Sequence, residues 1–138
     1  MLNPFRAFRR RAASGANAPH LRLGRAGEEA AAAEARARGW IILDRNWRYG
    51  HLELDLVCED RGEIVFLEVR TRTERYLVSP AESLTPEKCR RLVRAAQAWL
   101  GAHDAWERPC RFDLACVTAA DGGDGPYRTE ILSHVIEQ

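Results

Sequence analysis

The sequence lacks long apolar segments. No run approaches the roughly 18 consecutive apolar residues that a membrane-spanning helix needs. The N-terminal region also lacks the apolar stretch, about 7–15 residues long, that a secretory signal contains. We therefore expect neither a membrane-spanning helix nor a secreted chain.

Cysteine patterns typical of metal or disulfide chemistry are also missing. The chain has four cysteines, and none of them forms the CxxC or Cys/His spacing of a zinc site. Cys58 and Cys116 lie among apolar, strand-like residues, which favours a role as small core side chains. This cysteine usage fits a reducing compartment, so we expect a cytoplasmic protein.

Two common catalytic patterns are absent as well. The sequence shows no Ser-His-Asp or Cys-His arrangement that can be placed in a fold, and no glycine-rich phosphate loop before a helix. The four histidines are scattered. Of these, only His51 lies near the charged strands described below. It could be a ligand, a proton shuttle or a turn residue without a role.

Acidic residues are missing from the first 25 positions, which carry six arginines. The chain has 21 Lys and Arg residues in all, so the remaining positions carry 15 of them. The same positions carry all 20 acidic residues, which gives them a net charge of −5. We expect residues 1–22 to be a flexible basic arm and residues 23–138 to be a single domain. The arm could be a transit peptide, a nucleic-acid contact or a solvated tail.

The rest of the chain alternates helical and strand patterns, which predicts an α/β fold. Residues 25–38 are rich in strong helix formers, and Glu28 and Glu29 are expected in the first turn, where the helix dipole favours acids. Thr85 and Pro86 are typical of a helix start, and apolar residues recur at helical spacing up to about Ala102. Strand patterns cover residues 40–48, 52–58, 63–73 and 111–117, and residues 127–135 are either a fifth strand or an irregular tail. We expect a mixed, mostly antiparallel sheet of four to five strands flanked by helices.

Charged side chains interrupt two of these strands. Glu53 and Asp55 share one face of their strand, and Glu68 and Arg70 share one face of the next. Burying a carboxylate costs several kcal/mol unless it is paired or binds a metal ion. A hairpin that turns at residues 60–62 can bring Asp55 and Glu68 together, and two carboxylates suit a hard divalent cation.

A purely structural reading of these charges stays open. Glu68 and Arg70 could form an ion pair at the edge of the sheet, which would contribute little to stability. Glu28 could supply a third carboxylate to the site, or it could act only on its helix dipole.

Basic residues flank the proposed site. Lys88, Arg90 and Arg91 begin the second helix, where side-chain charge and free backbone N–H groups can hold a phosphate, or where they form only a solvated helix face. Trp47 and Tyr49 lie among these cations as candidates for base stacking, although Trp47 also fits a core position. The further candidates for phosphate contacts are Arg45, Arg48, Arg72 and Arg75.

Seven segments, taken together and in order, resemble the YraN-like family of small bacterial predicted endonucleases. This family is similar to Holliday-junction resolvases and to the restriction-endonuclease-like PD-(D/E)xK superfamily. The segments are Gly24–Glu28, Arg45–Arg48, Glu53–Val57, Val65–Arg70, Pro80–Glu82, Lys88 with Arg91 and Leu92, and Arg111–Leu114.

The resemblance implies a restriction-endonuclease-like core in the order α-β-β-β-α-β. It also implies that Asp55 and Glu68 bind the metal ion, that Glu28 assists, and that Arg70 is the basic member of the motif. The superfamily usually has Lys at the position of Arg70. Because Arg stays protonated, Arg70 can stabilise charge but cannot act as a general base.

From these features we expect a DNA endonuclease that depends on Mg²⁺ or Mn²⁺, with branched DNA as a candidate substrate and a homodimer as a candidate assembly. Lys88, Arg91, Arg45, Arg48 and Arg72 would hold the DNA phosphates. Two alternatives remain: a non-catalytic nucleic-acid-binding module on the same fold, and an adaptor whose acidic body faces a protein partner.

Overall fold

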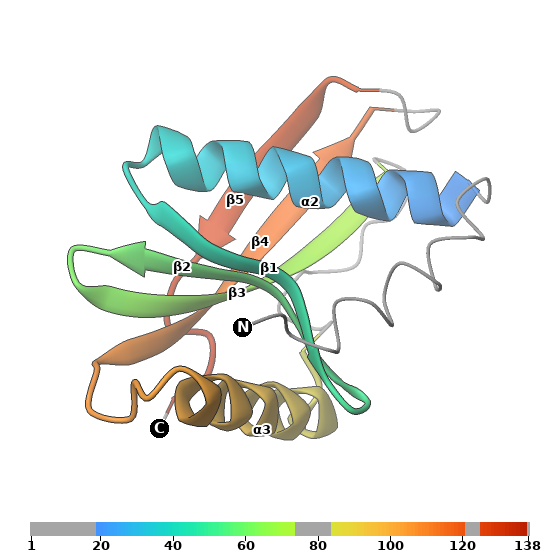
Figure 1. Ribbon diagram of the computed structural model, residues 1–138. Coiled ribbons are helices and arrows are strands. Elements are labelled where there is room, and N and C mark those ends of the chain that lie inside the picture. The colour runs from blue at the N-terminus through green and yellow to red at the C-terminus, as the bar shows by residue number, and fades with distance from the viewer. Residues whose placement is uncertain (1–18, 74–83, 121–124, 138) are drawn as a thin grey trace.

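The computed structural model describes residues 19–73, 84–120 and 125–137 (Figure 1). Within these residues two helices and five strands follow the order α-β-β-β-α-β-β, which confirms the predicted α/β class. The elements are α2 (Pro19–Ala37), β1 (Ile41–Tyr49), β2 (Leu52–Asp60), β3 (Glu63–Thr73), α3 (Pro86–Ala102), β4 (Cys110–Ala119) and β5 (Tyr127–Leu132). None of the described helices is long and apolar enough to cross a membrane.

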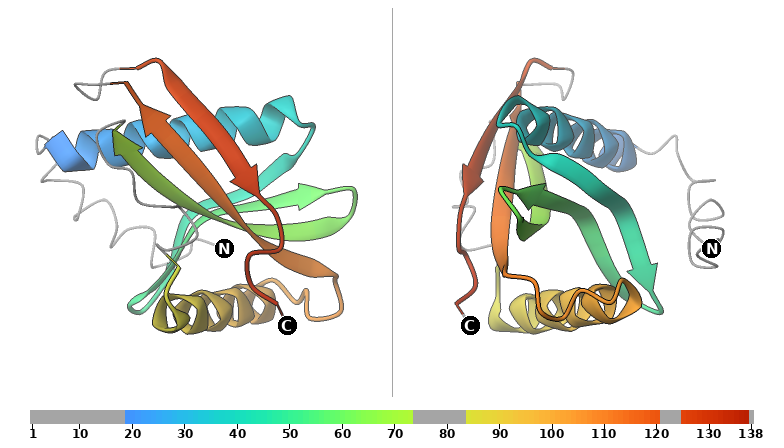
Figure 2. Two further views of the ribbon diagram at one scale, coloured as in Figure 1. Left: turned by 180° about the vertical axis from the view of Figure 1, so that it is seen from behind. Right: turned by 60° about the vertical axis from the view of Figure 1, so that its left-hand side comes forward.

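The five strands form one mixed sheet in the order β1-β2-β3-β4-β5. Neighbouring strands are antiparallel except β3 and β4, which are parallel and are connected through α3. α2 crosses one face of the sheet and α3 covers the other, as the views in Figure 2 show. The fifth strand is present at Tyr127–Leu132, so a strand is the correct alternative for that part of the chain.

Each helix covers its own apolar core. Beneath α2, the small side chains of Ala31, Ala32 and Ala35 pack against Leu67 and Val117 of the sheet. Beneath α3, Trp99 packs edge-on against Phe66, with ring centroids 5.9 Å apart. Cys58 and Cys116 are buried, as predicted, and burial raises the pKa of the Cys58 thiol to about 12. That thiol is therefore a core side chain and not a nucleophile.

The first helix begins at Pro19, six residues earlier than expected. Residues 19–22 therefore belong to the helix and not to the arm, and the rest of the predicted arm lies outside the described residues. The earlier start has a consequence for Glu28 and Glu29. Because the first turn of α2 contains no acid, the helix-dipole explanation for these two residues is wrong.

The second helix begins as predicted. The side chain of Thr85 accepts a hydrogen bond from the backbone N–H of Lys88 at 3.2 Å, and Pro86 occupies the first turn. The apolar stripe of α3 is buried at Leu92, Ala95, Ala96, Trp99 and Leu100. The loop predicted before this helix, residues 76–84, lies almost entirely outside the described residues.

The arrangement that shapes the candidate site is a divergence of β2 from β3. The two strands pair from Asp60–Glu63 as far as Leu56–Leu67, whereas β3 continues alongside β4 to Thr73. β2 also changes face here, because Leu54 packs beneath α3 while Leu56 packs beneath α2. Asp55 lies at this change of face, and Glu68 is the first residue of β3 beyond the paired region.

Candidate functional site

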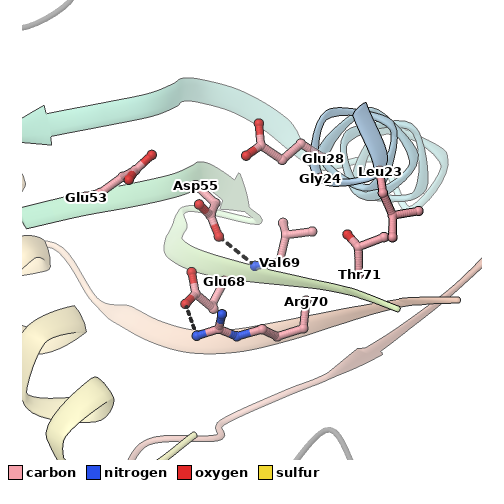
Figure 3. Close-up of a pocket in the computed structure, with 9 residues that line it drawn as sticks. All are labelled: Leu23, Gly24, Glu28, Glu53, Asp55, Glu68, Val69, Arg70 and Thr71. Carbon is pink, nitrogen blue, oxygen red and sulfur yellow. Dashed lines mark hydrogen bonds and ion pairs between the residues drawn. The ribbon is translucent and has the colours of Figure 1, made fainter. Parts of the chain in front are cut away.

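A polar pocket of about 440 Å³ opens where β2 and β3 diverge (Figure 3). Its floor comes from these two strands and one wall comes from α2. The residues that line it are Leu23, Gly24, Glu28, Glu53, Asp55, Glu68, Val69, Arg70 and Thr71. All four residues predicted as catalytic, Glu28, Asp55, Glu68 and Arg70, are among them.

The two carboxylates of the predicted metal site lie side by side. Oδ2 of Asp55 accepts a hydrogen bond from the backbone N–H of Val69 at 2.9 Å, and Glu68 shares a side-chain hydrogen bond with Asp55. Burial raises the pKa of Glu68 well above its ordinary value, and the hydrogen bond and negative charge of Asp55 raise it further. At neutral pH and without a cation, the pair therefore keeps a proton, because two adjacent buried carboxylates resist ionising together.

Arg70 supplies the positive charge beside this pair. Its guanidinium lies 3.1 Å from Oε2 of Glu68, and it lowers the pKa of Glu68 against the larger effects of burial and Asp55. Among the described residues, Arg70 Nε is one of two buried side-chain polar atoms that have no hydrogen-bond partner. A buried donor without an acceptor is costly, so this N–H is a candidate donor to a ligand oxygen.

Two further acids line the pocket. Glu28 extends from the middle of α2 on the side of Asp55, as Figure 3 shows. Glu53 lies on the other side of Asp55 and forms an ion pair with Arg48 at 3.4 Å. In the described part of the chain, no three His, Cys, Asp or Glu side chains come close enough to form a complete metal-binding cluster.

The donor set is therefore two carboxylates, Asp55 and Glu68. Zinc sites usually need three or four nitrogen or sulfur ligands, which this pocket does not offer. Mg²⁺ is commonly held by one or two carboxylates together with waters and substrate phosphate, and Mn²⁺ also suits oxygen ligands. The residues present fit Mg²⁺ or Mn²⁺.

A second pocket of about 180 Å³ adjoins the first, and α3 forms its wall. The two pockets share Glu53, Glu68 and Arg70. The second one adds Lys88 and Arg91, so these two predicted phosphate-binding residues lie beside the carboxylate pair. His51 lines the same pocket. It lies in the turn between β1 and β2, so it is a turn residue that also lines the pocket.

The other predicted DNA-binding arginines do not line these pockets. Arg45 pairs with Glu29 of α2 at 2.6 Å, and Arg48 pairs with Glu53. Arg72 lies farther along β3, opposite Thr118 of β4. Trp47 is buried in the core beneath α3, which settles its role as core packing. Arg75 lies outside the described residues.

Sequence reasoning missed two parts of the site. The first is the backbone N–H of Val69, which holds Asp55, because a backbone donor leaves no signal in the sequence. The second is the α2 wall at Leu23 and Gly24. Gly24 lies four residues before Glu28 and so on the same helix face, a spacing from which its place in the site could have been inferred.

The sequence matches an existing family. Residues 27–117 match the family described as "Uncharacterised protein family UPF0102", which covers the first helix from Gly27, β1 to β3, α3 and most of β4. The chain belongs to the UPF0102 family. The matched range contains Glu28, Asp55, Glu68, Arg70, Lys88 and Arg91.

Several bacterial relatives carry the same family description. A UPF0102 protein of Oleidesulfovibrio alaskensis is 59% identical over 108 residues, which is 78% of this chain and 54% of the relative. The match thus spans about half the length of that protein. A UPF0102 protein of Nitratidesulfovibrio vulgaris is 56% identical over 95 residues, 69% of this chain and 71% of the relative. One from Chlorobium phaeobacteroides is 39% identical over 113 residues, 82% of this chain and 90% of the relative.

Proposed function

We propose that this UPF0102 protein is a divalent-metal-dependent DNA endonuclease of the restriction-endonuclease-like type, acting in the cytoplasm. One observation carries the proposal: Asp55 and Glu68 lie side by side in a polar pocket with Arg70 on Glu68 and two further cations beside them. Paired carboxylates next to phosphate-binding cations suit metal-assisted hydrolysis of a phosphodiester.

Asp55 and Glu68 would hold the metal ion, Mg²⁺ or Mn²⁺. When bound, such an ion lowers the pKa of water and stabilises negative charge on phosphate oxygens. The protein's own contribution is to fix both ligands. The N–H of Val69 orients Asp55, and the strand pairing with β4 holds the backbone of Glu68.

Arg70 would bind the phosphate that reacts. Its guanidinium carries a permanent charge, and its unpartnered Nε–H offers a further hydrogen bond to a phosphate oxygen. Arg70 cannot remove a proton from water at neutral pH, so the base would have to be another group. Glu28, on the α2 wall, is the candidate for orienting the attacking water.

Lys88 and Arg91 would hold neighbouring phosphates of the same strand. Both lie on α3 in the pocket that adjoins the carboxylate pair, and phosphate contacts of this kind position DNA without reading its sequence. Arg45, Arg48 and Arg72 are proposed as outer contacts with DNA. Branched DNA is the proposed substrate and a homodimer the proposed assembly.

The proposal is tested by metal binding and cleavage in parallel. We expect calorimetry to detect Mn²⁺ binding to the wild type and not to Asp55→Ala, and the wild type to cleave linear, flapped or four-way DNA with Mg²⁺ or Mn²⁺. Glu34→Ala, which removes a partly exposed acid paired with Arg38 on α2, is the matched control and should behave as wild type. Absence of cleavage on all three DNA forms would refute the proposal.

Arg70 favours one alternative, a non-catalytic nucleic-acid-binding protein on the same fold. Arg replaces the lysine usual in the superfamily, and it retains charge while removing a group that could exchange a proton. This alternative predicts salt-sensitive DNA binding that neither Mg²⁺ nor Asp55→Asn alters. Metal-dependent cleavage by the wild type would exclude it.

A further inference from the structure

α2 contains two interior glycines, and packing explains only one of them. A Cβ built on Gly27 would lie 1.8 Å from Oγ1 of Thr71 on β3, so the helix can approach the sheet only without a side chain there. A Cβ built on Gly24 meets no atom of the described residues within 4 Å. Glycine destabilises a helix interior relative to alanine, and no contact among the described residues requires glycine at position 24.

The space beside Gly24 belongs to the carboxylate pocket. Gly24 lines that pocket together with Glu28, one helical turn further on, and Figure 3 shows both on the part of α2 that overlooks the site. A longer side chain at Gly24 would therefore occupy pocket volume rather than bulk solvent or the protein core.

The pocket continues past the carboxylates toward α3. Both pockets contain Glu53, Glu68 and Arg70, so they form one groove that runs across the ends of β2 and β3. Its α3 end is lined by the cations Lys88 and Arg91, whereas among the described residues its α2 end is lined by Leu23 and Gly24. The phosphates of a DNA strand can lie against the cations of the α3 end, while a sugar can lie against the uncharged residues Leu23 and Gly24.

We propose that this groove takes one strand of the DNA substrate and that Gly24 keeps its α2 end open. The strand's phosphates lie against Lys88 and Arg91, the reacting phosphate lies at the carboxylate pair, and the next sugar passes beneath Gly24. The inference rests on the proposed function, because it names the path of the substrate through that site. In this arrangement the lack of a side chain at Gly24 leaves the space that the DNA strand needs.

The test fills the opening without touching the metal ligands. The variants are Gly24→Ala and Gly24→Leu, and the control is Ala33→Leu, which adds the same side chain at an exposed position of α2. Three quantities are measured on the full chain: the melting temperature, Mn²⁺ binding by calorimetry, and binding of a fluorescein-labelled flapped DNA in EDTA. Cleavage of the same DNA with Mn²⁺ completes the set.

We expect Gly24→Leu to weaken DNA binding by about tenfold or more, with Gly24→Ala intermediate, because the lost contacts scale with the volume added. Mn²⁺ affinity should stay within about twofold of wild type. Both variants should melt at or above the wild-type temperature, since each replaces a helical glycine. Ala33→Leu should bind and cleave as wild type.

Other outcomes separate the inference from the function on which it rests. If wild type cleaves and Gly24→Leu binds and cleaves equally well, the groove assignment is wrong and the proposed function stands. If DNA binding falls only together with the melting temperature and Mn²⁺ affinity, Gly24 serves helix packing and the inference is overturned. If wild type neither binds nor cleaves the DNA, both fail.

Discussion

The backbone N–H of Val69 donates to Oδ2 of Asp55 at 2.9 Å, just beyond the point where β2 and β3 stop pairing. In a continued ladder this N–H would bond to a backbone carbonyl of β2. Because the strands diverge here, this N–H bonds to the side chain of Asp55 instead. The same irregularity therefore opens the pocket and fixes one of its carboxylates. Burial and the nearby negative charge of Asp55 then raise the pKa of the neighbouring carboxylate, Glu68.

The first prediction concerns the pH dependence of stability without metal. Because burial and Asp55 raise the pKa of Glu68 above its value in the unfolded chain, the folded state binds this proton more tightly. The stabilisation is present at acidic pH and is lost as pH rises from about 4.5 toward the raised pKa. Glu68→Gln keeps the shape without the charge, so it should stabilise the protein by about 1–2 kcal/mol near pH 8.

Urea denaturation in EDTA measures this effect. The difference in unfolding free energy between Glu68→Gln and wild type should be near zero at about pH 5 and grow toward about pH 8. Glu34→Gln, at a partly exposed site of α2, should show no such trend. A constant difference across this range would mean that Glu68 titrates normally.

The second prediction concerns the cations of α3. If Lys88 and Arg91 each neutralise one DNA phosphate, Lys88→Ala and Arg91→Ala should each reduce the slope of log K against log salt by about one. Arg90→Ala removes a neighbouring exposed cation that does not line the groove, and its slope should match wild type. Fluorescence anisotropy at several salt concentrations measures the slopes. If all three variants have the same slope, Lys88 and Arg91 do not contact DNA phosphates in the groove.

The sequence was sufficient for the features that follow from local patterns. Strand-like apolar segments predicted β2 and β3, and the Thr85–Pro86 start predicted α3, because capping and strand propensity act over a few residues. The pairing of Asp55 with Glu68 followed from the length of the hairpin. Each of these depends on neighbours in the chain and not on tertiary packing.

Tertiary geometry limited the rest. Pro19 falls within the predicted basic arm, although proline is common in the first turn of a helix, so the predicted start of α2 is too late. Strict alternation would also put Leu54 and Leu56 on one face of β2, whereas the two side chains pack beneath different helices. Such a change of face depends on packing against elements that are distant in the sequence, and a short window of residues does not record it.

The third prediction tests the contact that seats α2 on the sheet. Gly27→Ala would place a methyl group against Thr71, and overpacking of this kind costs about 1–3 kcal/mol. Thr71→Ala should relieve part of that loss in the double variant, because it removes Oγ1, the closest atom. Thermal unfolding of both single variants and the double variant measures the coupling. Gly24→Ala, three residues away, should change stability in the opposite direction.

The fourth prediction concerns a partly buried charge network beside the turn between β2 and β3. Arg111 contacts Glu63 at 2.7 Å, Asp60 at 3.0 Å and Asp113 at 3.0 Å. Asp113 is completely buried and also accepts the backbone N–H of His134 at 3.1 Å, which holds the chain after β5. Removing Arg111 would leave this carboxylate without its cation.

Arg111→Met should therefore destabilise the protein by about 3–5 kcal/mol, the usual cost of leaving a buried charge unpaired. Arg108→Met is the matched control, because Arg108 pairs with Glu59 at a more exposed position, and it should cost no more than about 1 kcal/mol. Urea denaturation measures both. Since Arg111 lines neither pocket of the groove, Mn²⁺ affinity of the folded Arg111→Met protein should equal that of wild type. A loss of metal binding without a loss of stability would show that the network supports the site rather than the fold.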